Sequence, residues 1–240
     1  MTSSLMFQPP LVLDSNEGDA AKNFPISLCV YSADSDMTPL YRLRYRAFRD
    51  AGWIGESAEE EFHDRFDEQR TTVSVGAFHN DACIGSVRLA FGGAGSPPRS
   101  MPCEEQFPDE IRALQTATPI RLVEFSRMAV EPTLSNNSFR TTLYAALVRA
   151  GFILTTASRV DVALIAVHRK VSPFYQAMCG FKVLGKSKSY AGILEPTHFL
   201  GLQFRELDER RKRRNAFFAI SGEEIEQARL LLAALRRPGD

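Results

Sequence analysis

The sequence predicts an α/β (α+β) fold, with a mixed, mostly antiparallel central sheet flanked by helices on both faces. Residues 71–78 and 82–91 alternate at a period of two around a short polar turn, which is typical of a β-hairpin. Further on, apolar residues recur at helical spacing over 138–157, directly before a short apolar run at 161–167. The order of these elements indicates an antiparallel first half and mixed strands in the second half.

The remaining elements follow in chain order. Residues 1–23 are polar, contain prolines and lack periodicity, so we expect a mobile N-terminal arm. Pro39 suits the first turn of a helix that ends before Gly52. The sequence also predicts strands at 26–31, within 121–132, at 181–184 and at 198–205, and helices at 103–114, 172–178 and 223–236.

The composition fits one globular domain with a proper core. The chain has 240 residues, of which 44% are hydrophobic and 24% charged. Basic and acidic residues number 29 each, so no overall charge favours nucleic acid as a partner. We therefore divide the chain into the N-terminal arm (1–23), a single domain (24–205), and a charged helical extension (206–240) packed on that domain.

Cysteine usage and the apolar runs indicate the compartment. Cys29, Cys83, Cys103 and Cys179 form no metal-ligand pattern, so we predict reduced thiols and no metal site. Cys179 could line a pocket or simply pack. The longest apolar run, 160–167, is too short to cross a bilayer, and the N-terminus lacks the pattern of a signal peptide. Together these features predict a soluble cytoplasmic protein.

The segment 121–132 is an apolar strand that carries Glu124, Ser126 and Arg127. Because side chains alternate across a strand, we expect Glu124 and Ser126 to share one face with Met128, and Arg127 to lie on the other. Charged side chains inside an apolar strand are costly unless they are paired or take part in chemistry. These residues alone are equally compatible with a buried ion-pair lattice and with a reaction centre.

Short motifs along the first half occur in a fixed order. They are Arg44 with Phe48 and Trp53, Asp64 with Asp67, Gly85 before Arg88-Leu89, Phe107, and Glu124-x-Ser126-Arg127. In this order they resemble the acyl-homoserine lactone (autoinducer) synthases and the related N-acyl amino acid synthases, both of the GNAT acyltransferase superfamily. The resemblance covers roughly residues 40–132 and implies a GNAT-like acyltransferase fold.

The second half resembles the ordinary GNAT ending, with strand 162–167, Ser172-Pro173-Phe174-Tyr175 and Gly180-Phe181. This ending is better kept in the N-acyl amino acid synthases. The resemblance therefore implies a bacterial N-acyltransferase that moves a medium- or long-chain fatty acyl group to the α-amine of an amino acid. Two alternatives stay open: a lactone synthase that uses S-adenosylmethionine, and a non-catalytic acyl-binding module. The acceptor amino acid, the chain length and the oligomeric state are left open as well.

The loop before helix 138–157 bears on the acyl donor. Acetyl-CoA enzymes of the superfamily hold the CoA pyrophosphate on a Gly-rich loop at a helix N-terminus, whereas residues 132–138 contain no glycine. A free helix N-terminus can still hold one phosphate, which matches the phosphodiester of acyl carrier protein. The resemblance thus favours the acyl-phosphopantetheine of acyl carrier protein over CoA, with no tightly bound cofactor. The lipid product could associate peripherally with a membrane.

The resemblance assigns catalytic roles to three residues. Glu124 becomes the general base, acting through a water, with a pKa raised by burial; alternatively it only pairs with Arg88 or Arg127. Ser126 could hydrogen-bond the substrate or orient the carbonyl, or be a strand-filling hydroxyl. Tyr175 matches the tyrosine that protonates the leaving thiol, although a buried aromatic residue is the alternative.

A further set of residues is expected to shape the acceptor site. Its charged members would form a lattice of opposite charges, but Asp64 and Asp67 could instead lie in a solvated acidic loop. Its aromatic members mainly pack, and Trp53 could close the acceptor pocket; neither His63 nor His168 is assigned a role. The set consists of Arg44, Phe48, Trp53, Asp64, Asp67, Arg88, Phe107 and Arg127.

The C-terminal extension contains two features with open roles. The basic run 210–214 could dock an acidic carrier protein or be a solvated helix face. The helix at 223–236 could seal an acyl tunnel, pack on the sheet or mediate a dimer.

Overall fold

A single eight-stranded sheet forms the centre of the molecule, in the order β1-β2-β3-β4-β5-β6-β8-β7. The computed structural model describes residues 3–5, 26–115, 119–190, 193–207, 215 and 217–236. Within these residues β5 and β6 are parallel and the other neighbours antiparallel, which confirms the predicted mixed sheet. The strands are β1 (Ser3–Leu5), β2 (Ser27–Ser32), β3 (Thr72–His79), β4 (Ala82–Gly93), β5 (Arg121–Val130), β6 (Val162–His168), β7 (Lys182–Tyr190) and β8 (Ile193–Gln203).

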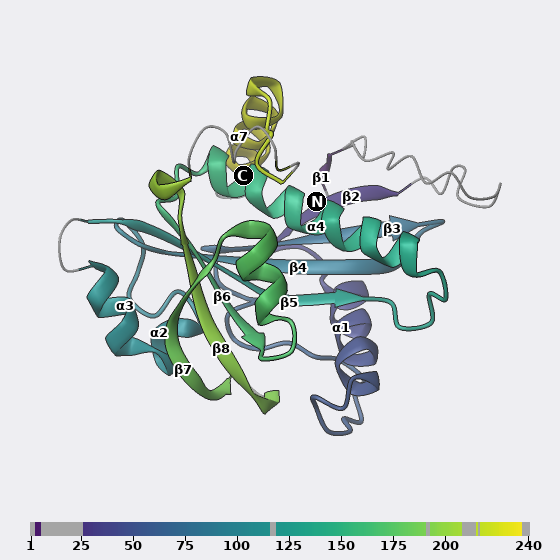
Figure 1. Ribbon diagram of the computed structural model, residues 1–240. Coiled ribbons are helices and arrows are strands. Elements are labelled where there is room, and N and C mark those ends of the chain that lie inside the picture. The colour runs from purple at the N-terminus through teal and green to yellow at the C-terminus, as the bar shows by residue number, and fades with distance from the viewer. Residues whose placement is uncertain are drawn as a thin grey trace.

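Helices cover both faces of the sheet (Figure 1). One face carries α4 and α7, and the other carries α1, α2 and α3. Two apolar clusters lie under α1 and under α2 and α3, and the largest fills the space between the sheet, α4 and α7. The helices are α1 (Thr38–Asp50), α2 (Cys103–Gln106), α3 (Pro108–Gln115), α4 (Asn137–Ala157), α5 (Ser172–Phe174), the π-helical turn η1 (Tyr175–Cys179), the 3₁₀ turn η2 (Phe204–Glu206) and α7 (Gly222–Arg236).

Two predicted helices differ from the observed ones. The helix expected at 103–114 divides at Phe107, whose φ of −130° and ψ of 51° lie outside the helical region. Pro108 follows, and its ring disfavours helical geometry in the preceding residue. The helix expected at 172–178 changes to π geometry from Tyr175 and ends at Gly180, whose φ of 83° suits a residue without Cβ.

The parallel strands β5 and β6 separate partway along their length. Their register covers only residues 122–125 of β5 and 162–165 of β6. Both strands continue, β5 to Val130 and β6 to His168, but no further pair between these two strands is recorded in the described chain. The strands therefore form a V-shaped opening that begins at Ser126.

The two ends of the chain extend this core. Ser3–Leu5 of the expected N-terminal arm form β1, which pairs with β2, and the rest of residues 1–23 lies outside the described residues. The basic run 210–214 also lies outside them. In the C-terminal extension, α7 buries Ala228, Leu231 and Leu232 in the cluster beneath α4. No described helix combines the length and the apolar character needed to cross a membrane.

Candidate active site

The central strand β5 has a β-bulge at Arg127. Arg127 has a φ of 52°, in the left-handed region. In the pairing with β4, Arg88 lies opposite Ser126 while Ser86 lies opposite Ala129, so two residues of β5 face one residue of β4. A bulge of this kind re-aims the side chains that follow it.

Because of the bulge, several side chains of β5 do not lie on the predicted faces of the strand. Past Arg127 the alternation changes phase, so Ala129 joins the cluster under α1, while Met128 and Val130 pack against the cluster under α4. The guanidinium of Arg127 reaches the carboxylate that Arg88 also binds. The prediction that Arg127 lies opposite Glu124 and Ser126, and that Met128 accompanies them, is therefore wrong. A regular alternation cannot anticipate an inserted residue.

Five charged side chains from four elements form one buried lattice on the α1 face. Arg44 of α1 donates to Asp67 at 2.7 Å, and Arg88 of β4 donates to Asp67 at 2.9 Å and to Asp64 at 2.7 Å. Arg127 of β5 donates to Asp64 at 2.6 Å. Arg44 and Arg88 are completely buried, so the lattice satisfies groups that water cannot reach. The alternative of a solvated acidic loop does not hold for Asp67, which is 2% exposed.

The lattice fixes the charge of its members. Burial alone would raise the pKa of the Asp64 and Asp67 carboxyls, but the adjacent arginines lower both pKa values below their usual range. Burial, together with the nearby Arg88, lowers the pKa of Arg127 to about 10. Asp64, Asp67 and Arg127 are thus ionised at neutral pH.

Ser126 links the lattice to the opening between β5 and β6. Its Oγ accepts a hydrogen bond from Nε of Arg88 at 3.0 Å. Because Arg88 is the donor, the serine hydroxyl can donate its own hydrogen. Ser126 also lines the pocket described below.

Glu124 lies one strand step from Ser126 and is completely buried. Its Oε2 accepts a hydrogen bond from the backbone N–H of Cys103, at the start of α2, at 2.7 Å. Burial raises the pKa of Glu124 to about 7, although this hydrogen bond and Arg88 act in the opposite direction. Glu124 is not part of the pocket lining. A proton could therefore reach it only through an intermediary.

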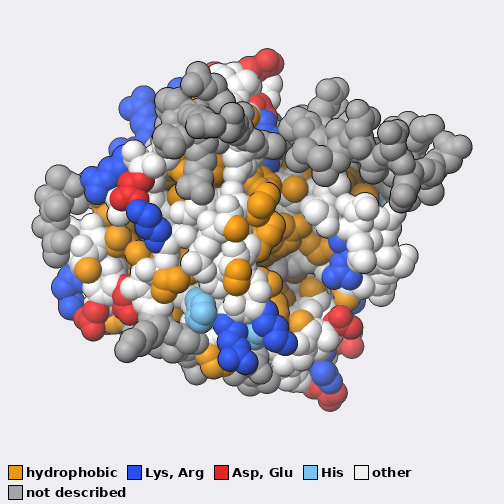
Figure 2. Space-filling view, in the orientation of Figure 1, with side chains coloured by type: hydrophobic (Ala, Val, Ile, Leu, Met, Phe, Trp, Pro, Cys, Tyr) orange, Lys and Arg blue, Asp and Glu red, His pale blue; other side chains and the backbone are white. Residues whose placement is uncertain are grey.

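A pocket of about 170 Å³ occupies the opening between β5 and β6. Figure 2 shows apolar side chains gathered around a hollow on this side of the molecule. The lining comes from both faces of the sheet and is mostly apolar. It consists of Phe48, Trp53, Val87, Phe125, Ser126, Arg127, Met128, Tyr144, Val148, Phe152, Ile165, Ala166, Val167, His168, Val171, Tyr175, Cys179, Phe181, Ile193 and Thr197.

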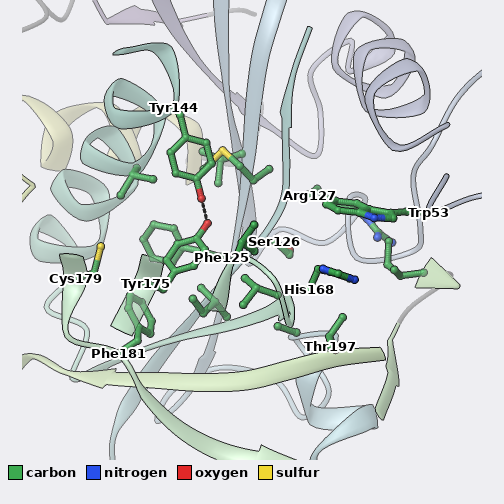
Figure 3. A pocket seen from close by; sticks show the side chains of 18 of the residues that line it. Trp53, Phe125, Ser126, Arg127, Tyr144, His168, Tyr175, Cys179, Phe181 and Thr197 are labelled. Atoms are coloured by element: carbon green, nitrogen blue, oxygen red, sulfur yellow. Dashed lines mark hydrogen bonds between the residues drawn. The ribbon is translucent and has the colours of Figure 1, made fainter. Parts of the chain in front are cut away.

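The two ends of the pocket differ in character (Figure 3). At one end Trp53 stacks on His168, with ring centroids 5.9 Å apart, and Arg127 and Thr197 lie nearby. At the other end the labelled side chains are those of Tyr144, Tyr175, Cys179 and Phe181, while Ser126 lies between the ends. The pocket thus joins a polar end to an end that is largely apolar.

Two tyrosines meet across the apolar end. The hydroxyl groups of Tyr144, on α4, and Tyr175, on η1, are hydrogen-bonded to each other. Burial raises the pKa of Tyr175 to about 12, and burial beside Tyr175 also raises the pKa of Tyr144. Both phenols are therefore neutral at physiological pH and can donate a proton.

The structure sorts the predicted site residues into three groups. Phe48, Trp53, Ser126, Arg127 and Tyr175 line the pocket. Arg44, Asp64, Asp67, Arg88 and Glu124 lie behind it, in the lattice or beside α2. Phe107 is elsewhere: it is fully buried and stacks on Phe199 with ring centroids 4.3 Å apart.

Among the pocket residues to which sequence reasoning assigned no role, His168 and Tyr144 carry polar groups. His168 ends the apolar strand β6 and lies opposite Thr197 of β8, so a polar residue at the end of a buried strand was the available signal. Tyr144 lies one residue from Leu143, on the buried side of α4. A polar aromatic residue beside an apolar helix stripe was the signal there.

Comparisons with known proteins identify the fold and the family of the chain. The solved structure of FeeM, an N-acyl amino acid synthase from uncultured soil microbes, matches with a TM-score of 0.63 and 16% identity, covering 81% of this chain and 97% of that chain. TofI, in a complex with an inhibitor and MTA, matches with a TM-score of 0.55 and 17% identity, covering 82% and 98%. BjaI, a CoA-dependent acyl-homoserine lactone synthase, matches at 0.51 and 15%, covering 84% and 97%. No curated protein sequence matches the chain significantly.

The chain therefore shares the fold of these solved structures. The family model described as N-acyl amino acid synthase FeeM matches residues 39–203. The chain therefore belongs to the FeeM family of N-acyl amino acid synthases, which confirms the resemblance stated on its motifs.

Proposed function

We propose that the protein transfers a medium- or long-chain fatty acyl group from acyl carrier protein to the α-amine of an amino acid. The observation that carries this proposal is the pocket between β5 and β6, which joins an apolar end to a polar end at Ser126. An acyl chain fits the apolar end because burying each methylene contributes about 0.8 kcal/mol. The amino acid then occupies the polar end, beside Arg127, His168 and Thr197.

The thioester carbonyl would lie where the strands separate. Beyond Phe125 the backbone of β5 has no recorded strand partner on the β6 side in the described chain. N–H groups there can polarise the carbonyl oxygen and stabilise the negative charge that develops on it. The hydroxyl of Ser126, held by Arg88, provides a further oriented donor at this point.

Proton transfers accompany the exchange of a C–S bond for a C–N bond. The amine must be neutral to attack, and we assign its proton finally to Glu124, whose pKa of about 7 suits a base at neutral pH. Because Glu124 does not line the pocket, the proton would pass through a water or Ser126. The neutral Tyr175, oriented by Tyr144, would protonate the departing thiolate. The resulting tyrosinate would regain a proton from water, and Glu124 would release the proton of the amine to water, so that one proton in total moves from the amine to the thiol.

The N-terminus of α4 favours a donor with one phosphate group. The side chain of Asn136 caps this terminus by accepting the N–H of Phe139 at 3.0 Å. Fewer N–H groups then remain for an anion, which fits the single phosphodiester of phosphopantetheine on acyl carrier protein better than the pyrophosphate of CoA.

The test compares lipid extracts of cells that express the wild type or Glu124→Gln, by mass spectrometry. We expect open-chain N-acyl amino acids from the wild type and a strong reduction in the variant, with equal amounts of folded protein. A lactone with released methylthioadenosine would instead identify a lactone synthase. No acylated product from the wild type would overturn the proposal.

The donor is tested separately with purified protein. Acyl carrier proteins loaded with saturated chains of several lengths are compared with the matching acyl-CoA thioesters, each with a mixture of amino acids. We expect turnover with the carrier protein at lower concentrations. Equal or better turnover with acyl-CoA would contradict the assignment of the donor and leave the transfer reaction standing.

A further inference from the structure

The apolar end of the pocket is backed by a part of the chain that the family match does not cover. Phe152 of α4 lines the pocket. Its ring packs against Phe218 at a centroid distance of 4.8 Å and against Phe204 at 6.0 Å. Both partners follow residue 203, where the match to the family model ends. Phe204 and Phe218 therefore support the pocket wall from behind.

Hydrogen bonds fix this segment to two walls of the pocket. Nδ2 of Asn215 donates to the backbone oxygen of Met178, the neighbour of the lining residue Cys179, at 2.5 Å. Arg149 of α4 donates to the backbone oxygen of Ala219 at 3.2 Å and to Glu224 of α7 at 2.7 Å. Arg149 is only 7% exposed, so the donor side of both bonds is shielded from water. The segment is thus held in place on both sides of Phe218.

A glycine on α4 sets the position of the neighbouring ring. A Cβ added at Gly151 would overlap the ring of Phe125, which lines the pocket and lies 5.3 Å from Phe152. Glycine inside a helix is unfavourable by about 1 kcal/mol relative to alanine, so its presence here reflects the space that the ring needs. A methyl group at this position would push the ring of Phe125 toward the pocket.

We propose that Phe125, Phe152 and Phe218 form the stop that sets the length of the transferred acyl chain, with the C-terminal segment as its backing. This inference rests on the proposed function. A chain that reaches the stop buries all of its methylenes, whereas a longer chain must displace closely packed rings. The described part of the extension, residues 215 and 217–236, would then determine specificity as well as contribute to stability.

Two substitutions should shift chain length in opposite directions. Phe218→Ala removes the ring behind Phe152 and lets the wall yield, so we expect longer acyl chains, by on the order of one two-carbon step. Gly151→Ala moves Phe125 inward, so we expect shorter chains. The matched control is Leu230→Ala on α7, because Leu230 is 65% exposed. The readout is the chain-length distribution of N-acyl amino acids in extracts of expressing cells.

A second readout requires no turnover. Trp53 is the single tryptophan and lines the pocket, so its fluorescence can report the binding of saturated fatty acids of increasing length. We expect the length that binds best to increase in Phe218→Ala, to decrease in Gly151→Ala, and to stay unchanged in Leu230→Ala. Circular dichroism melting verifies that each variant is folded.

The outcomes separate this inference from the proposed function. An unchanged distribution and an unchanged binding optimum in both folded variants would overturn the chain-length stop, even if the wild type makes N-acyl amino acids. If the wild type makes none, the proposed reaction fails, and the fatty acid titration alone decides whether the stop exists. Shifts in the same direction in both variants would also overturn it.

Discussion

The two faces of β5 around the pocket are stabilised by different forces. On the α1 face, Arg88 joins Asp64, Asp67 and Ser126 through hydrogen bonds between mostly buried charged or polar groups. On the α4 face, Phe125 packs with Phe152 and other apolar side chains. Removing one partner of a buried charged pair strongly destabilises the fold, whereas apolar packing accommodates substitutions that conserve volume. We therefore expect the charged face to fix geometry and the apolar face to adapt to substrates.

The sharpest test of this comparison is Arg88→Ala. This substitution removes the arginine that Asp64 and Asp67 share, and Asp67 is buried. We expect the free energy of unfolding, measured with urea, to fall by about 3–5 kcal/mol. The control Arg112→Ala removes an exposed ion pair with Asp109 and should change the free energy of unfolding little. A small loss for Arg88→Ala would show that the lattice does not support the fold.

The pH dependence of stability separates the two kinds of buried carboxyl. The pKa of Glu124 is raised from 4.5 to about 7, so the native state binds the extra proton and stability falls as pH rises from about 4.5 to 7. The effect is on the order of 3 kcal/mol. The pKa values of Asp64 and Asp67 are lowered, so stability is also lost as pH falls below about 4. Urea unfolding of Glu124→Gln should no longer show the loss of stability between about pH 4.5 and 7, but should still show the loss below about pH 4. If the loss at acid pH also disappears, the assignment of the two effects to different carboxyls is wrong.

The same substitution should reduce activity while it preserves local structure. The side-chain oxygen of Gln can still accept the N–H of Cys103, but the amide cannot take a proton. We expect kcat/KM to fall about 100-fold. In the wild type kcat/KM should rise through pH about 7, because the ionised form of Glu124 is the active base. An unchanged pH profile in Glu124→Gln would assign the titration to another group.

A smaller effect is expected on the apolar side. Tyr175→Phe keeps the packed ring and removes the hydroxyl that bonds Tyr144. We expect kcat to fall about 10-fold, with KM nearly unchanged, because the phenol acts only when the thiolate leaves. Tyr144→Phe is the matched variant and should have a milder effect. Equal losses in both would contradict the assignment of the proton donor to Tyr175 alone.

The elements and most of the site motifs could be predicted because they follow local rules. The hairpin of β3 and β4 has a two-residue period, and Glu124, Ser126 and Arg127 are unusual in an apolar strand. The bulge at Arg127 could not be predicted, because it depends on pairing with β4. The separation of β5 from β6 is equally non-local, so the sequence identified the charged residues but did not divide them between pocket and lattice.

The smallest predicted effect tests how the two faces are coupled. Ser126→Ala removes the acceptor of the Arg88 Nε–H, and Arg88 is completely buried. We expect stability to fall by about 1–2 kcal/mol. Ser126→Thr keeps the hydroxyl and should recover most of this loss. If Ser126→Ala lowers kcat/KM only as far as it lowers the fraction of folded protein, the hydroxyl serves only to hold Arg88. A larger loss of kcat/KM at full folding would show that it also contacts the substrate, so that the charged face acts on the reaction through this residue.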